Sequence, residues 1–148
     1  MAKLEPRNTQ TRVKHEILSS YLDTWGGIIV SGLRNARPRV RHFVYVDCFS
    51  FLGRYSGEKE EEIQKRESKE VFGSPVIGIN ALDKLLTHSQ KMGVDIQIST
   101  ILVEKDKKVF GDLKETLQSA GYQNRVEETK DFYKLKNGQI AVVNADAT

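Results

Sequence analysis

The chain has 148 residues, of which 39% are hydrophobic, and this is enough for one domain with its own core. No run of 18 apolar residues occurs, which argues against a membrane-spanning helix, and the polar first residues lack the apolar segment of a signal peptide. The net charge of +3 permits contact with nucleic acid without indicating it. The single cysteine, Cys48, cannot form an internal disulfide, so we expect a protein of the reducing cytoplasm.

An amphipathic helix is predicted within the N-terminal segment, residues 1–33. Thr11 is a suitable N-cap, and the pair Gly26-Gly27 is expected to end the helix or to bend it before Ile28. Apolar residues recur at every fourth position and form one stripe: Val13, Ile17, Tyr21 and Trp25, with Leu18 and Leu22 beside them.

A linker with four arginines, interrupted by Pro38, follows at residues 34–42. It is either a solvated connection or an edge that contacts phosphate, because the guanidinium group suits phosphate. Aromatic residues that could stack on bases are not interleaved with the arginines, so the nucleic-acid signal is weak.

Residues 42–57, HFVYVDCFSFLGRYSG, are the stretch around which the rest of the chain is organised. Residues 42–46 are β-branched and aromatic, as in a strand packed on both faces. Asp47 ends this strand, and a loop closed by glycines follows. A buried strand that runs into a tight loop is where α/β sheets bind ligands, at the carboxyl ends of the strands.

A charged insertion is predicted next, at residues 58–72, because Ile63 is the one apolar residue between positions 58 and 70. We expect it on the surface, either as a mobile excursion with a helical middle or as a solvated helix. A helix then begins at Gly73-Ser74-Pro75, with Ser74 as cap and proline in the first turn, and it reaches Met92.

The remaining elements are a strand at residues 94–104, a helix at 107–120 and strands at 125–129 and 139–146. The order predicts a single α/β domain over residues 1–148: a Rossmann-like three-layer sandwich with a mostly parallel, incomplete sheet of about four strands. The connection at 130–138 is short for a parallel crossover. Either one helical turn bridges it or the last two strands pair antiparallel.

Four ordered motifs resemble one known family. KHEIL with YLDTW, then YVDCFSFLGRYSG, then GSPVIGINAL, then ILVEKD are similar to the pattern of the three-Cys-motif partner family, TcmP. The match runs from Lys14 to about Asp106. The resemblance implies the fold of class I S-adenosylmethionine-dependent methyltransferases, with S-adenosylmethionine as cofactor.

The family pattern carries over to particular residues. Asp47 matches the acid after the first strand, Phe49 the phenylalanine of the loop and Gly53 its last glycine. Glu104 matches the acid that would hold the ribose hydroxyls. The pair Arg54-Tyr55 and the triplet Gly73-Ser74-Pro75 also match the family pattern. The chain departs from the family at Ser50-Phe51, where the family has Ala-Gly, and a phenylalanine is costly where glycine gives close approach or positive φ.

Simpler roles compete with these. Asp47 could cap the loop through backbone N–H groups, Asp106 suits an N-cap better than a ligand contact, and Cys48 is expected to be a small buried filler. The histidines have no metal-ligand spacing, so no metal is assigned: they are His15, His42 and His88.

The prediction is a methyltransferase-like domain with a degenerate cofactor loop, a fragment or truncated form of a longer enzyme. Such enzymes carry Asp or Asn followed by prolines on the acceptor side, and Asp146 stands near that place without the proline. Asp146 is thus the one candidate for a catalytic residue, its acceptor is unknown, and the chain alone is expected to be inactive. The alternatives are a non-catalytic interaction module of the same fold and a nucleic-acid-binding accessory protein. An uncovered strand edge predicts self-association or a partner protein.

Overall fold

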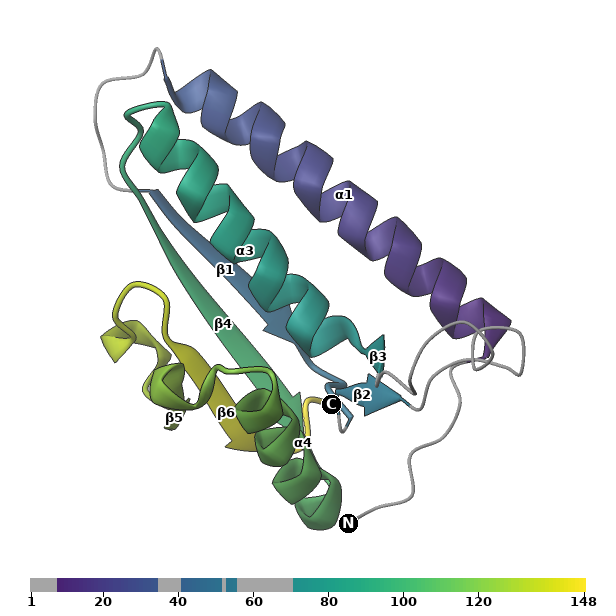
Figure 1. Cartoon of the computed structure of the whole chain (residues 1–148). Helices are drawn as coiled ribbons and strands as arrows, with labels where there is room; N and C mark the ends of the chain where they lie inside the picture. Colours follow the sequence, from purple (N-terminus) through teal and green to yellow (C-terminus); the bar gives the residue numbers. More distant parts are fainter. Residues whose placement is uncertain (1–7, 35–40, 52, 56–70) are drawn as a thin grey trace.

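The computed structural model describes residues 8–34, 41–51, 53–55 and 71–148 (Figure 1). Its centre is a four-stranded sheet in the order β1-β4-β6-β5, and every pairing in it is parallel. The strands are β1 (Arg41–Asp47), β4 (Ile96–Glu104), β5 (Val126–Glu128) and β6 (Ile140–Asn144). The described helices are α1 (Thr9–Leu33), α3 (Ser74–Lys91) and α4 (Lys107–Ser119). The α/β class and the parallel sheet of an incomplete Rossmann-like sandwich are therefore confirmed.

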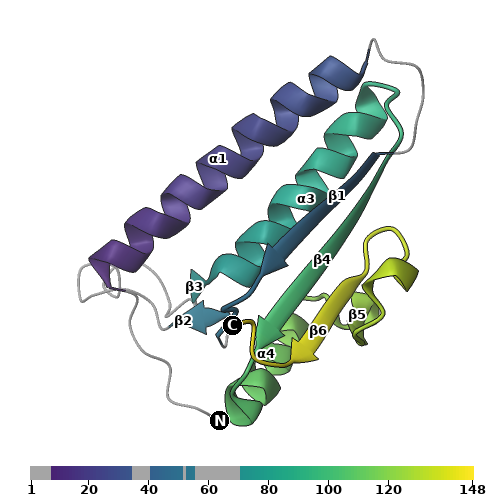
Figure 2. The same cartoon turned by 180° about the vertical axis from the view of Figure 1, so that it is seen from behind.

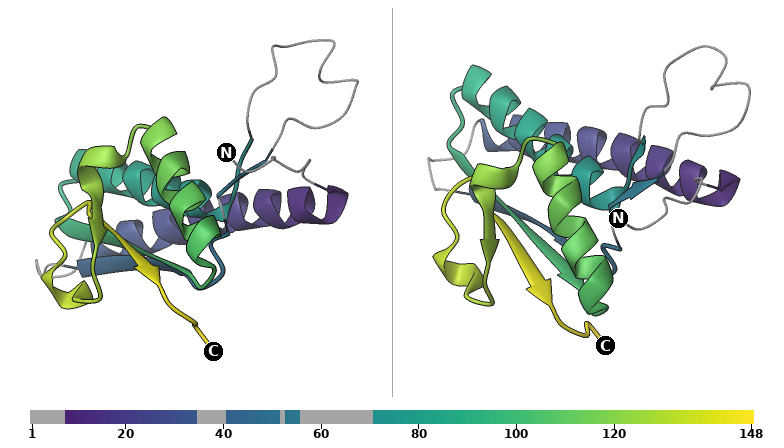
Figure 3. Two further views of the ribbon diagram at one scale, coloured as in Figure 1. Left: turned by 90° about the horizontal axis from the view of Figure 1, so that it is seen from below. Right: turned by 60° about the horizontal axis from the view of Figure 1, so that its bottom comes forward.

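The three described helices lie on one face of the sheet. In the parallel register Phe43 pairs with Ile98 and Leu102 with Val142, so these side chains point to the same face. That face holds both hydrophobic clusters, into which all three helices send side chains. Figures 2 and 3 show the sheet from behind and from below, with the helices gathered on one side. Among the described residues, no helix covers the opposite face, where the third layer of a complete sandwich would lie.

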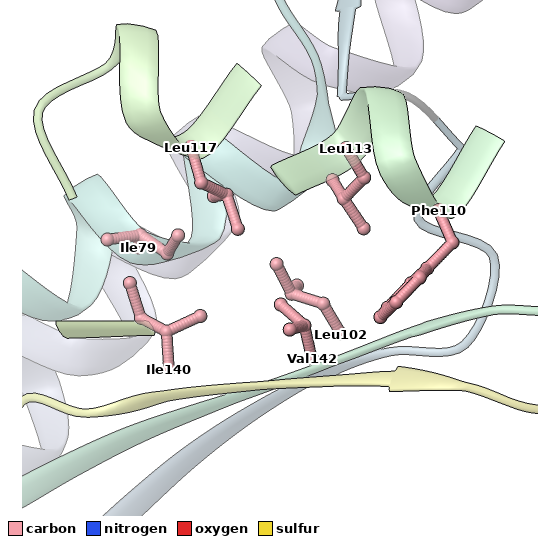
Figure 4. Packing of buried hydrophobic residues seen from close by; sticks show 7 residues of the cluster. All are labelled: Ile79, Leu102, Phe110, Leu113, Leu117, Ile140 and Val142. Carbon is pink, nitrogen blue, oxygen red and sulfur yellow. The ribbon is translucent and has the colours of Figure 1, made fainter. Parts of the chain in front are cut away.

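The first cluster holds α4 and the middle of α3 on the sheet (Figure 4). Each fully buried aliphatic side chain is expected to contribute about 1.5–3 kcal/mol to the free energy of folding. This cluster therefore supplies a large part of the free energy that holds α4 on the sheet. Its buried members are Ile79, Leu102, Phe110, Leu113, Leu117, Ile140 and Val142.

Helix α1 differs from its prediction in three ways. Its N-cap is Asn8, whose side chain accepts from the Thr11 backbone N–H at 2.7 Å, and Thr11 lies inside the helix. Gly26 neither ends nor bends the helix: it is buried, and a Cβ there would lie 2.8 Å from a Leu85 methyl, so the glycine allows α1 to approach α3. The predicted apolar stripe is exposed from Val13 to Tyr21, and at Trp25 it meets the core through the Phe43 ring.

Helix α3 sits close to β1 because Gly78 faces the ring of Tyr45. A Cβ built on Gly78 would lie 2.1 Å from Cε1 of that ring, far inside van der Waals contact. Tyr45 packs against both hydrophobic clusters. Glycine is therefore required at this helical position by the approach of a strand side chain, despite its low helix propensity.

Helix α4 and the C-terminal strands agree with the sequence analysis. The Asp106 carboxylate accepts from the backbone N–H groups of Lys108 and Val109, both at 2.9 Å, so Asp106 is the predicted N-cap. Strands β5 and β6 pair in parallel, and the short connection between them contains the 3₁₀ turn Phe132–Lys134. This confirms the single helical turn and excludes the antiparallel alternative.

The loop after β1 contains an element that the sequence did not predict. Strand β2 (Arg54–Tyr55) pairs antiparallel with β3 (Val71–Phe72), the last two residues of the predicted insertion. Gly73 N–H also donates to the Gly53 carbonyl at 2.7 Å. The rest of the insertion, residues 58–70, and the linker at 35–40 lie outside the described residues.

A polar cluster ties α3 to the connections beside β5. Arg125 donates to both carboxylate oxygens of Asp83, at 2.9 and 2.8 Å, and to the Gly138 carbonyl at 2.7 Å. The guanidinium also lies 5.4 Å from the centre of the Tyr122 ring, whose hydroxyl is bonded to Asn80. This bidentate arrangement is strong for a half-exposed pair, because two parallel charge-assisted bonds fix its geometry.

The Gly78 contact predicts the effect of one substitution. Gly78→Ala should lower the free energy of unfolding by about 1–3 kcal/mol, because the strand or helix must shift to clear the Tyr45 ring. Gly111→Ala in α4 is the matched control: nothing lies within 4 Å of its Cβ position, so helix propensity alone should raise stability by about 0.5–1 kcal/mol. Urea unfolding of both variants checks this, and a Gly78→Ala protein as stable as the wild type would contradict the packing argument.

Candidate ligand site at the carboxyl edge of the sheet

Two acids lie at the carboxyl ends of neighbouring strands. Asp47 is the last residue of β1 and pairs with Leu102, so Glu104 at the end of β4 extends two residues further along the same edge. Asn144, at the end of β6, pairs with Glu104. Parallel pairing therefore brings together residues that are 57 and 40 positions apart in sequence. This is the edge at which open parallel sheets bind ligands.

Asp47 fixes the start of the loop. Its Oδ1 accepts from the Phe49 N–H at 3.1 Å, and its Oδ2 accepts from the Ser74 hydroxyl at 2.6 Å. The Ser50 hydroxyl donates to the Asp47 carbonyl at 3.0 Å. The loop-capping role considered for Asp47 is thus present, and the same carboxylate also holds the first residue of α3.

Glu104 holds the loop from the other strand. Its Oε2 accepts from the Phe51 N–H and its Oε1 from the Asp106 N–H, both at 2.9 Å. Each carboxylate oxygen has two lone pairs, so each keeps room for one further donor. Glu104 can therefore act as a loop anchor and still accept from two hydroxyl groups of a ligand.

Two of the described loop residues lie in the left-handed region. Gly53 has φ +75°, and its Cα faces Leu113 and Thr116, with a built Cβ only 3.1 and 3.3 Å away. Phe51 has φ +50°, which costs a non-glycine residue about 1–2 kcal/mol. This is a conformation that glycine adopts without strain, and glycine is the residue that the resemblance implies at position 51.

Two of the predicted side-chain roles are wrong. Ser74 is not the cap of α3: Gly73 occupies that position, and the Ser74 hydroxyl is turned to Asp47 because that carboxylate lies beside the first helical turn. Cys48 is exposed and is not a buried filler, since it occupies a turn beyond the end of β1. Phe49 is also largely in solvent, with 76% of its side chain exposed.

Asp146 lies two residues past β6 and is exposed. It accepts from the Thr148 hydroxyl at 2.7 Å and from the Thr148 N–H at 3.0 Å, and these bonds lower the pKa of its carboxyl. The neighbouring polar group that reaches Glu104 is Asn144, whose side-chain amide donates to the Glu104 and Lys105 carbonyls at 2.9 and 3.0 Å. Asn144 and Ser74 were missed, because only the pairing of distant strands gives them their partners.

A serine–histidine pair lies elsewhere on the sheet. His42 Nε2 and the Ser99 hydroxyl are 2.6 Å apart, across β1 and β4 on the face without a described helix. Ser99 is 2% exposed, and among the described contacts no carboxylate joins the pair. Burial of the hydroxyl within the sheet argues against a nucleophile. The described residues also contain no group of three or more side chains placed to hold a metal ion.

Comparisons with known proteins add no relative: no protein-family model, no curated protein and no solved structure matches the chain. Within the described residues, none of the helices has the length and apolar character needed to cross a membrane. The interpretation of the site therefore depends on its geometry.

The Glu104 contacts predict a stability effect. Glu104→Gln should lower the free energy of unfolding by about 1–3 kcal/mol, because the amide nitrogen cannot accept and one backbone N–H loses its partner. Glu128→Gln is the control, since Glu128 is exposed and makes only a surface ion pair with Lys114, for which we expect at most about 0.5 kcal/mol. Equal urea midpoints for the two variants would show that Glu104 does not anchor the loop.

Tyr45 predicts how stability depends on pH. Its hydroxyl donates to the Ser74 carbonyl at 3.2 Å, and burial, together with the charge of Asp47, raises its pKa far above the ordinary value of 10.0. Above pH 10 the unfolded chain loses this proton while the folded chain keeps it, so stability falls as the pH rises. Tyr122 has a pKa raised in the same direction by burial, so it adds to the slope.

Tyr45→Phe should therefore reduce, without abolishing, the loss of stability between pH 9 and pH 11. At neutral pH the variant should lose about 1 kcal/mol of unfolding free energy, because its hydrogen bond to Ser74 is gone. Tyr133→Phe, at a side chain 82% exposed, should keep the wild-type slope. Thermal unfolding followed across this pH range measures both. The same slope in Tyr45→Phe and wild type would contradict the assignment.

Proposed function

We propose that the chain is an S-adenosylmethionine-dependent methyltransferase-like domain with a degenerate cofactor loop, in which the cofactor lies along the loop from Asp47 to Gly53 and its ribose lies at Glu104. The observation that carries the proposal is the pair of acids at adjacent parallel strand ends, with a left-handed loop held between them. Acceptors for ribose hydroxyls beside a tight loop are what adenosine-containing ligands need.

The residues present fit the ribose side of such a ligand. Each oxygen of Glu104 accepts one backbone bond and can accept another. Phe51 has a positive φ, which glycine adopts without strain, and this supports the resemblance at this position. When bound, S-adenosylmethionine would supply an electrophilic methyl group; the residues of this chain would bind and orient it.

The side chain at position 51 is the reason to expect weak binding. Phe51 adds an aromatic ring, 45% exposed, where glycine would leave space for the ligand. We expect no methyl transfer by the chain alone, because no described residue is placed as an acceptor-side base and Asp146 is bonded to Thr148. The acceptor is unassigned.

The second candidate is a non-catalytic interaction module of the same fold. Both site carboxylates are already bonded within the protein, and Phe49 and Phe51 are exposed at the same edge, 76% and 45%. Exposed aromatic side chains suit contact with another macromolecule. The cytoplasmic location and a nucleic-acid-binding role stay predictions from the sequence, and the arginines between residues 35 and 40 lie outside the described part of the chain.

Titration with S-adenosylmethionine and with S-adenosylhomocysteine tests the proposal. Wild type should bind weakly, Phe51→Gly should bind more tightly because the ring is removed and positive φ is unstrained, and Phe51→Leu should stay weak because it keeps the bulk. Isothermal titration calorimetry and thermal shifts provide the affinities.

Glu104→Gln, made in the Phe51→Gly protein, should reduce the affinity again, because one ribose acceptor is lost. If neither ligand binds to Phe51→Gly while that variant is folded by circular dichroism, the cofactor proposal is wrong and the interaction module is favoured. Transfer of labelled methyl by the wild-type chain to nucleic-acid or protein acceptors would contradict the expectation of inactivity.

A further inference from the structure

The outer edge of β1 is open among the described residues. β1 pairs with β4 on one side, and no described strand pairs with the other. The strand is seven residues long, and Val44 and Val46 on the face without a described helix are 46% and 51% exposed. A long edge strand with apolar side chains is a template for pairing with another strand.

The sequence of β1 is complementary to itself when read antiparallel. With Val44 opposite Val44 of a second copy, Arg41 lies opposite Asp47 and Phe43 opposite Tyr45, all four on the helical face. Opposite charges and aromatic pairs directly across an antiparallel ladder each contribute about 0.2–1 kcal/mol. In the same register His42 lies opposite Val46 on the other face. No like charges oppose each other in the ladder, and the one mixed pair is His42 with Val46.

Helix α1 presents an apolar stripe beside this edge. The stripe is centred on Tyr21, which is 61% exposed. It consists of Val13, Ile17, Tyr21, Trp25 and Ile28. In a monomeric protein the apolar stripe of a surface helix usually faces the core, as it does in α3. A contiguous apolar stripe that is exposed to solvent marks an interaction surface.

The middle of the α1 stripe, at Tyr21, lies beside the middle of β1, at Val44. Tyr21 and Trp25 of α1 and Phe43 and Val44 of β1 line the same groove of about 200 Å³, which α3 closes on its third side. Trp25 and Phe43 meet edge to face with ring centroids 5.7 Å apart. Helix α1 runs antiparallel to β1 (Figure 1). One two-fold axis near this groove would therefore relate both the strand and the helix to their copies.

We propose that this surface binds a second copy of the chain, with β1 pairing antiparallel to β1 of the partner about Val44 and the α1 stripes packing against each other. The two parallel sheets then join into one continuous sheet. An isologous contact requires a surface that is complementary to itself, and the Arg41–Asp47 pairing and the shared centre at Tyr21 and Val44 meet this requirement. Asp47 belongs both to this surface and to the candidate ligand site, so the dimer is tested on the chain without added cofactor.

Cysteine crosslinking tests the register. In a Cys48→Ser background, Val44→Cys should form a symmetric disulfide under mild oxidation, because directly opposed Cα atoms lie about 4.5–5.5 Å apart. Val46→Cys is the matched control on the same strand and face, with similar exposure. Its two copies would be displaced by four residues, about 13 Å, and should not crosslink. The double variant His42→Cys/Val46→Cys should crosslink again.

The mass of the chain in solution completes the test. Light scattering should give a dimer of the 16.8 kDa chain, and Tyr21→Lys should shift it to monomer while circular dichroism shows that the fold is kept. A monomer at high concentration with no Val44→Cys crosslink would overturn the proposal and would leave the edge to a strand of another protein. A dimer in which Val44→Cys and Val46→Cys crosslink equally would also overturn it.

Discussion

The contact between the Tyr45 ring and Gly78 is the constraint on which the rest of the structure depends. It brings α3 onto β1 at a distance that no side chain larger than hydrogen permits at position 78. The ring also joins the two hydrophobic clusters, and its hydroxyl donates to the Ser74 carbonyl. The first turn of α3 is thereby fixed beside Asp47, so core packing and site geometry depend on the same residue.

The carboxyl edge of the sheet shows how acids can serve structure and leave room for a ligand. Asp47 and Glu104 hold the loop from two strands, through Phe49 on one side and Phe51 on the other. The strain at Phe51, with φ +50°, is offset by the hydrogen bond from its own N–H to Glu104. Removing this bond would release the loop, so the proposed binding role and the structural role of Glu104 are coupled.

Helix α1 shows that an apolar sequence pattern predicts a helix but not which surface covers its apolar face. The apolar spacing correctly predicted a helix, but the buried residues of α1 are His15, Gly26 and Val30, and the stripe is largely exposed. The periodicity of apolar residues predicts that a helix has an apolar face, but it does not predict what covers that face. The same limit applies to Gly26, where the sequence suggested a break and packing against Leu85 requires a close approach within a continuous helix.

The sequence by itself determined the α/β class, a mostly parallel sheet, the N-cap at Asp106 and the positions of Asp47 and Glu104 at strand ends, because these follow from local propensity and from the order of the elements. Only the tertiary structure decided the partners of Ser74, Asn144 and His42 and the burial of Gly78. These depend on residues 27 to 57 positions away in sequence, such as the Asp47–Ser74 and His42–Ser99 pairs. Strand register and helix approach bring such residues together, and neither is encoded in a local pattern.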